Sequence, residues 1–223
     1  MQSKMMKAAL VLLLWTCAAL AQAGVAGVVV KLSGPMSARG TDGALKALSP
    51  QSEIASGDTL VTAAQTYALV RFIDNSELTL RPNTSVVVDQ FSFDSAHPEA
   101  DRAAYTLIKG GLRSVTGLLG KRSKEKFAMK TPSATIGIRG TTFLLEYIGA
   151  KGEPAASPAL DAGLHVHVSE GGISLVNDAG QFQYDPGQFG YIKDYATKPV
   201  KMTANPGMRF TPPPGFGDGA VLQ

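Results

Sequence analysis

The chain has 223 residues, with 21 Lys and Arg, 18 Asp and Glu, and one cysteine, Cys17. This nearly balanced charge offers no concentrated basic surface, so we expect no nucleic-acid partner. One cysteine cannot form an intramolecular disulfide, so stability must come from core burial, for which the length suffices.

Residues 1–23 show the three zones of a secretory signal peptide. Lys4 and Lys7 precede an apolar run, and Ala21-Gln22-Ala23 is a small-residue cleavage pattern before Gly24. The apolar run is shorter than the roughly 20 residues of a membrane span, and no later stretch is as hydrophobic. We therefore predict cleavage between Ala23 and Gly24 and a periplasmic mature protein. Without the two lysines, 19 basic residues balance 18 acidic ones, and the net charge is near +1.

Cys17 raises the question of a lipid anchor. The residues before it, Leu14-Trp15-Thr16, place a bulky Trp where lipoprotein signals have small residues. We expect no lipidation, and contact with a membrane would require it.

Short runs in which apolar and polar residues alternate follow along the chain, bounded by Gly, Pro, Asn or Asp. The clearest are Tyr67–Ile73, Glu77–Arg81, Ser85–Phe93, Thr141–Tyr147, Leu164–Val168 and Ile173–Val176. They predict an all-β chain, a roll or β-solenoid-like stack of short strands joined by tight Gly, Asn and Asp turns. A two-sheet sandwich is the alternative, because alternation does not reveal strand order.

Turn signals support this interpretation. Asp74-Asn75-Ser76 and Asn177–Gly180 each predict a tight hairpin turn. Only His97–Tyr105 has the composition for a turn or two of helix, after Pro98. The segments Leu107–Val115 and Val168–Val176 form a weak repeat, each with a strand, a Gly-Gly corner and another strand.

We divide the chain into the signal peptide (1–23), an all-β domain (24–195) and a Pro/Gly-rich C-terminal tail (196–223). Residues 205–223 contain four prolines and four glycines and little to bury. This composition predicts an extended tail or a partner-docking arm.

Three features, in order, resemble the FecR family of bacterial periplasmic regulatory domains. The first is Ala55–Thr62 followed by Arg81–Ser85. The second is the Gly110-Gly111 corner followed by Phe127–Phe143, which contains the specific stretch TPSATIGIRGTTF. The third is Val168–Ile173 with Pro186-Gly187-Gln188. The resemblance covers residues 24–192.

The resemblance implies a regulator with a cytoplasmic anti-sigma segment, a membrane span and a periplasmic domain that receives a signal from an outer-membrane transporter. Here a signal peptide replaces the first two parts, so we expect a stand-alone form that does not contact a sigma factor. We expect a structural role for the residues that match the family motifs: Gly57, Asp58, Gly110, Gly111, Thr131, Pro132, Gly137, Arg139, Gly140, Thr141, Gly171 and Gly172.

Arg139 could clamp an anionic ligand, but its flanking glycines favour a side chain that fixes a tight corner. Thr131-Pro132 is expected to end one strand and direct the next. His165 and His167 lie on one face of a strand near Glu170, an arrangement for which zinc is one interpretation. We expect a solvent-facing polar stripe instead, with Leu164, Val166 and Val168 on the apolar face.

The cationic run Lys121–Lys126 could contact anionic polymers, but a solvated loop is the expectation. No Gly-x-Ser-x-Gly elbow is present, and a carboxylate pair such as Glu146 with Glu170 depends on the fold. We therefore expect no catalytic, cofactor or metal site.

These features predict a non-enzymatic periplasmic protein that acts in protein–protein interaction, ligand sensing or signal relay with an unidentified envelope protein. Edge-strand or surface recognition is the expected mode. The alternative is a wall-associated module that uses the cationic run and the tail to hold glycan or to self-associate.

Overall fold

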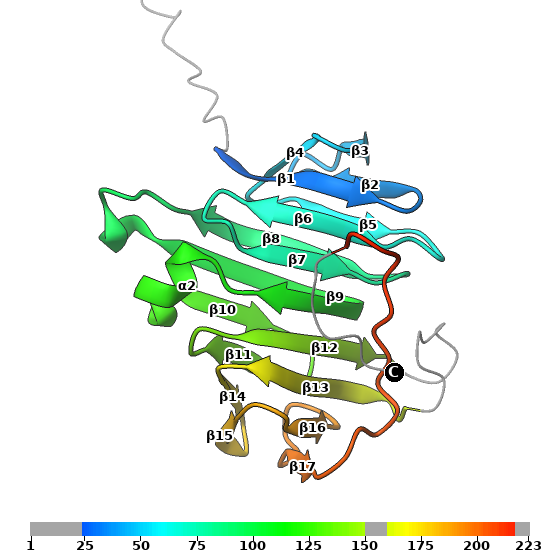
Figure 1. The fold of residues 1–223 in the computed structure, drawn as a ribbon, viewed down its shortest axis with the longest axis vertical. Coiled ribbons are helices and arrows are strands. Elements are labelled where there is room, and N and C mark those ends of the chain that lie inside the picture. The colour runs from blue at the N-terminus through cyan, green and yellow to red at the C-terminus, as the bar shows by residue number, and fades with distance from the viewer. Residues whose placement is uncertain (1–23, 150–159, 217–223) are drawn as a thin grey trace, which may run out of the picture.

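The computed structural model describes residues 24–149 and 160–216 (Figure 1). The predicted signal peptide, with Ala23 and Cys17, lies outside the described residues, as does the end of the tail (217–223). No helix in the described part of the chain is long and apolar enough to cross a membrane.

The prediction of an all-β chain is confirmed, because nearly every described element is a strand. The first nine strands are β1 (Val25–Leu32), β2 (Met36–Arg39), β3 (Leu45–Leu48), β4 (Glu53–Ala55), β5 (Thr59–Thr62), β6 (Ala68–Phe72), β7 (Glu77–Leu80), β8 (Ser85–Ser92) and β9 (Arg102–Val115). The others are β10 (Phe127–Lys130), β11 (Thr135–Ile138), β12 (Thr142–Ile148), β13 (Gly163–Glu170), β14 (Ile173–Asn177), β15 (Gly180–Tyr184), β16 (Phe189–Ile192) and β17 (Val200–Met202).

The strands stack in two layers that share the long strand β9 (Figure 1). Sheet A has the order β4-β1-β6-β7-β9-β12-β13-β16-β17. Sheet B has the order β3-β2-β5-β8-β9-β10-β11-β14-β15. The pairings are antiparallel except the parallel pair β9–β10. The result is an open roll of stacked turns, not a closed barrel.

The chain passes repeatedly from one sheet to the other through tight corners. The corner residues include many with positive φ: Gln51, Gly57, Gln65, Asn83, Gly110, Gly140, Gly171 and Gly187. The predicted Gly-Gly corners are among them. β9 bends from sheet B into sheet A at Gly110, and the chain returns from β13 to β14 through Gly171.

Both predicted hairpin turns are present. Asn75 has φ 63° between β6 and β7, and Asn177 pairs with Gly180 between β14 and β15. The predicted helical turn after Pro98 is the single 3-10 turn η2 (Pro98–Ala100). Extending it to Tyr105 is wrong, since Ala103 and Tyr105 alternate into the core as part of β9.

The segment Lys121–Lys126 connects two strands and is largely solvated, as expected, but it is not an irregular loop. The segment forms the helix α2 (Leu118–Arg122) and the 3-10 turn η3 (Lys124–Lys126). Leu119 is only 1% exposed and packs α2 on the core. The charged residues around it make this contact hard to predict from the sequence.

The main core lies between the sheets and contains a row of aromatic rings. Phe72 stacks on Phe91 with ring centroids 4.7 Å apart, and Tyr105 contacts both rings. The row continues through Phe127 to Phe143 with centroid separations of 5.9 and 6.3 Å. Edge-on and offset ring pairs of this kind stabilise a core beyond their buried area.

Residues 203–216, which we call the strap, run from β17 back along sheet A (Figure 1). Phe210 and Phe216 are 3% and 2% exposed, and both contact Tyr67 edge-on. The Lys31 ammonium donates to the Pro214 carbonyl over 2.8 Å. The interpretation that this segment has little to bury is therefore wrong, because its aromatic side chains dock on the chain's own sheet.

The corners at Gly140 and Gly171 lie against each other. A Cβ added at Gly171 would be 2.0 Å from the carbonyl oxygen of Gly140, and Gly171 has φ +74°. Both observations require glycine at position 171.

Gly171→Ala should lower the free energy of unfolding by about 2–4 kcal/mol, since the strained backbone and the clash add. Gly43→Ala is the matched control, because Gly43 has φ +80° but no atom within 4 Å of an added Cβ. It should lose only about 1 kcal/mol. Urea unfolding followed by circular dichroism measures both, and equal losses would contradict the packing account.

Candidate interaction site

The family-motif residues lie at several corners rather than in one cluster. Gly57 and Asp58 join β4 to β5, where the Ala55 amide donates to the Asp58 carboxylate over 2.9 Å. Thr131 and Pro132 lie in the β10–β11 hairpin, where the Thr131 hydroxyl accepts from the Ala134 amide over 3.0 Å. An added Cβ at Gly111 would be 2.8 Å from the Leu145 carbonyl oxygen on β12.

The second half of the motif builds the contact between the β11–β12 and β13–β14 corners. Thr141 Oγ1 donates to the Gly172 carbonyl over 2.5 Å and accepts from the Arg139 amide over 3.1 Å. The Arg139 guanidinium lies against Gly172 and donates to Asp185 over 2.8 Å. Arg139 thus joins three corners of the stack while its side chain stays 47% exposed.

The prediction that His165 and His167 face solvent is wrong, because they are 3% and 8% exposed. The His165 ring stacks on Tyr191 and the His167 ring on Phe189, with centroids 4.9 and 4.2 Å apart. Phe189 belongs to a small outer cluster with Leu144 and the strap residues Met208 and Phe210. The strap therefore covers the face that alternation assigns to water.

The same covered face holds a buried ion pair. Arg81 Nη1 donates to Glu146 Oε2 over 2.5 Å, with side chains 5% and 2% exposed. Glu146 lies opposite His165 in the β12–β13 ladder, whereas Glu170 lies opposite Thr142. Four residues of strand separate the two carboxylates by roughly 13 Å, more than a glycosidase pair requires.

Titration of His167 provides a test of this covered face. Burial lowers the pKa of His167 below its ordinary value of 6.5, so the unfolded chain binds the proton at a higher pH than the folded one. The contribution of neutral His167 to stability is present above pH 6.5 and is lost as the pH falls through its lowered folded pKa.

We expect the free energy of unfolding to fall between about pH 7 and 5, and His167→Phe to flatten that slope. Phe preserves the ring stacking on Phe189 and cannot titrate. Ser169→Ala, which removes the hydroxyl 3.5 Å from His167, should retain the parent slope. Urea unfolding at several pH values measures all three, and equal slopes for His167→Phe and the parent would contradict the prediction.

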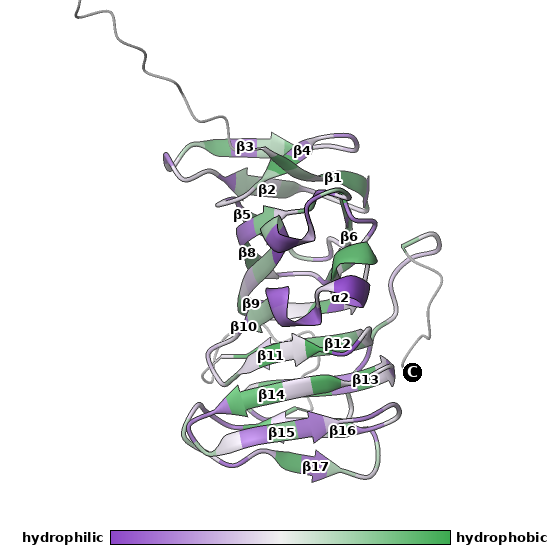
Figure 2. Cartoon of the chain, turned by 90° about the vertical axis from the view of Figure 1, so that its left-hand side faces the viewer, coloured by the Kyte–Doolittle hydropathy of each residue, from purple (hydrophilic) through white to green (hydrophobic). Residues whose placement is uncertain are grey.

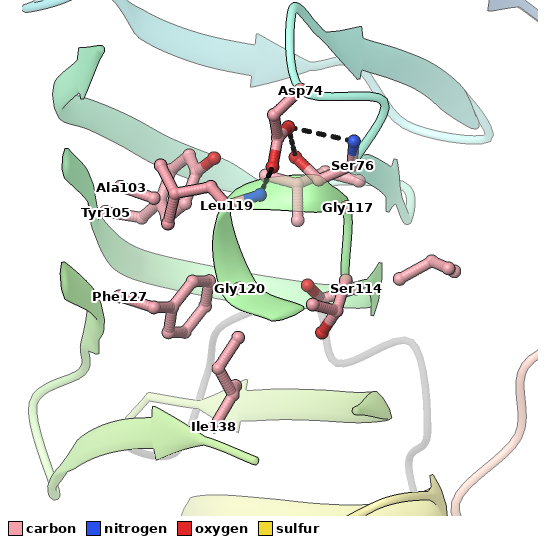
Figure 3. A pocket seen from close by; sticks show the side chains of 13 residues that line it. Asp74, Ser76, Ala103, Tyr105, Ser114, Gly117, Leu119, Gly120, Phe127 and Ile138 are labelled. Atoms are coloured by element: carbon pink, nitrogen blue, oxygen red, sulfur yellow. Dashed lines mark hydrogen bonds between the residues drawn. The ribbon is translucent and has the colours of Figure 1, made fainter. Parts of the chain in front are cut away.

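A small internal pocket lies where α2 docks on the β6–β7 turn (Figure 3). The Asp74 carboxylate accepts from the Ser76 amide and hydroxyl over 2.9 and 2.6 Å and from the Leu119 amide over 3.1 Å. The cavity volume is about 10 Å³, room for one water. Asp74 therefore joins the short helix to the hairpin, and the pocket is too small for a ligand.

A larger groove lies on the outer face of sheet B. The strands that line it, β10, β11 and β14, lie below α2 in Figure 2. The groove has a volume of about 390 Å³, and it is shallow and widely open to solvent. We call it the motif groove, because five of its lining residues belong to the stretch TPSATIGIRGTTF. It is lined by Lys124, Glu125, Phe127, Ala128, Thr135, Ile136, Gly137, Ile138, Arg139, Ser174 and Val176.

Several cations follow one another along the sequence from α2 to β10, the elements beside the motif groove. Arg122 donates to Asp101 and lowers the pKa of that carboxyl. In the described part of the chain, no ion pair is recorded for four neighbouring lysines, Lys121, Lys124, Lys126 and Lys130. Lys124 lines the groove and Lys130 projects from the same outer face of β10, so two exposed lysines flank it.

The sequence interpretation identified Gly137 and Arg139 but not the groove, since its lining comes from three strands and η3. Residues 24–149 and 160–216 contain no group of three or more His, Cys, Asp or Glu side chains placed to hold a metal ion.

A family model described as FecR protein matches residues 58–174. Two crystal structures described as "a putative anti-sigma factor" from Parabacteroides distasonis are similar to the chain, with TM-scores of 0.49 and 0.48 and identities of 13% and 12%. Each match covers 65% of this chain and only 58% of the other. No curated protein matches the chain.

Proposed function

The chain belongs to the FecR protein family, and on that premise we propose that it is a non-enzymatic binding protein of the cell envelope. The predicted signal peptide exports it, and the mature chain from Gly24 acts in the periplasm. There it relays or senses a signal by binding another envelope protein. The tail belongs to the same functional unit, because the strap packs on sheet A.

The motif groove is the observation that carries this proposal. It lies almost wholly in residues 58–174, the part that the family model matches. Its position on an outer sheet face leaves it accessible to another protein. The carboxylates of Asp74, Asp101 and Glu146, in contrast, accept hydrogen bonds from groups of the fold, which supports a binding role over acid–base catalysis.

Crosslinking mass spectrometry of the tagged mature protein in intact cells tests the proposal. We expect one abundant envelope protein whose crosslinks map to lysines around the motif groove, such as Lys124 and Lys130. Thr211→Glu, at an exposed position of the strap, serves as the comparison, because a loss of crosslinks in this variant would indicate that the strap contacts the partner directly. Crosslinks that connect the protein only to copies of itself, or retention only on purified cell wall, would contradict the relay function.

A further inference from the structure

Gly137 lies in the middle of β11. Glycine weakens the interior of a strand, so its presence there needs an explanation. No contact within the described chain supplies one. The ladder between β11 and β14 is continuous, φ at Gly137 is not positive, and an added Cβ would meet no atom closer than 3.9 Å. A strand glycine also marks a place where a ligand or another backbone approaches closely.

The absent side chain keeps the floor of the motif groove low. Beside Gly137, the outward-facing residues on the two neighbouring strands are Ala128 and Ser174. The floor at this point therefore consists of small side chains and backbone. Val176, 44% exposed, supplies apolar surface beside it, whereas the Phe127 ring points into the aromatic row of the core. A shallow trough along two strands, with an apolar side chain on one side and lysines on the other, suits an extended chain whose alternate side chains point to opposite sides.

The charged residues at the motif groove indicate which charge a bound segment would carry. Lys124 and Arg139 line the groove, and Lys130 projects from the same outer face of β10. The opposing acids are Glu125, which also lines the groove, and Asp185, which pairs with Arg139. The excess of lysines is complementary to carboxylates.

We propose that the motif groove binds an extended segment of a partner protein in which apolar side chains alternate with carboxylates. The segment lies along β11 and β14 over Gly137, with its apolar side chains against Val176 and its carboxylates toward Lys124 and Lys130. This inference rests on the proposed function and names the chemistry of the partner. An anionic glycan would meet the same lysines, but it would leave hydroxyls without partners against the apolar surface.

Fluorescence anisotropy with the mature protein tests the proposal. The probe is the labelled heptapeptide Ser-Glu-Val-Glu-Val-Glu-Ser, and its counterpart carries Lys in place of Glu. We expect the acidic peptide to bind, the basic one to bind at least tenfold more weakly, and added salt to weaken the acidic complex. Equal affinity for the two peptides would overturn the proposal.

Two variants locate the site. Gly137→Leu fills the floor and should weaken the acidic peptide at least tenfold, with Gly137→Ala intermediate. Ser37→Leu is the matched control, since Ser37 faces outward on β2, five strands from β11 in the same sheet. Lys124→Glu should weaken binding several-fold, and Lys46→Glu, at an exposed position on β3 beyond β2 in the same sheet, should leave it within twofold.

Circular dichroism and thermal melting establish whether each variant folds. If Gly137→Leu does not fold, the milder Gly137→Ala still tests the proposal. Unchanged affinity in the folded Gly137 variants would overturn the proposal, as would soluble peptidoglycan fragments that replace the peptide in the groove. Capture of an envelope partner at another surface in cells would overturn the groove assignment alone and leave the relay function standing.

Discussion

Arg81→Met is expected to lower the free energy of unfolding by about 3–5 kcal/mol, because it leaves the carboxylate of Glu146 buried opposite an apolar side chain. The pair lies under the strap, in a region lined by Leu144, Met208 and Phe210. Urea unfolding monitored by circular dichroism measures the loss.

The double variant Arg81→Met with Glu146→Leu is the decisive comparison. Removing both charges also removes the desolvation cost, so the double variant should regain most of the stability lost by the single one. A double variant as unstable as Arg81→Met would show that lost packing, not the loss of the Arg81–Glu146 charge pair, causes the destabilisation.

Phe210→Ala should lower the free energy of unfolding by about 3–5 kcal/mol, because it empties a buried site between the strap and Tyr67. Thr211→Ala, at the exposed neighbouring position, should change it by no more than about 0.5 kcal/mol. Equal stability of the two variants would indicate that the strap adds nothing to the fold. Exchange of backbone amide hydrogens in β12 and β13 would then also be unaffected by Phe210→Ala.

Local signals in the sequence predict the hairpins and corners well. Asn75 and Gly110 occupy positions where a positive φ is needed, and only a few residue types tolerate it. The all-β class follows from the same runs of alternation. These features depend on neighbours within a few residues, which a sequence displays directly.

The covered face of sheet A could not be predicted in this way. His165 and His167 alternate with apolar residues as a solvent-facing stripe would, and only the docked strap and β16 make that face buried. The strap in turn depends on contacts such as Tyr67 with Phe210, which are far apart in the sequence. Its prolines and glycines conceal the two aromatic anchors.

The sequence indicates some residues of the motif groove but not the groove itself. Gly137 belongs to a specific motif, which predicts only a structural role for it. The empty space above its Cα becomes evident only once β11 is placed beside β14 and η3. The cationic run Lys121–Lys126 is evident in the sequence, but its position beside a groove follows from the α2–η3 turn.

Site-specific photo-crosslinking in intact cells tests the central claim most directly, namely that the protein binds an envelope partner through the motif groove. A photoreactive residue replaces Val176 at the groove, or Ile73 at the exposed β6–β7 turn as the matched control. The account predicts one discrete envelope-protein adduct at Val176 that Gly137→Leu abolishes and Ser37→Leu preserves. The same adduct at Ile73, or an adduct at Val176 that persists in Gly137→Leu, would contradict it.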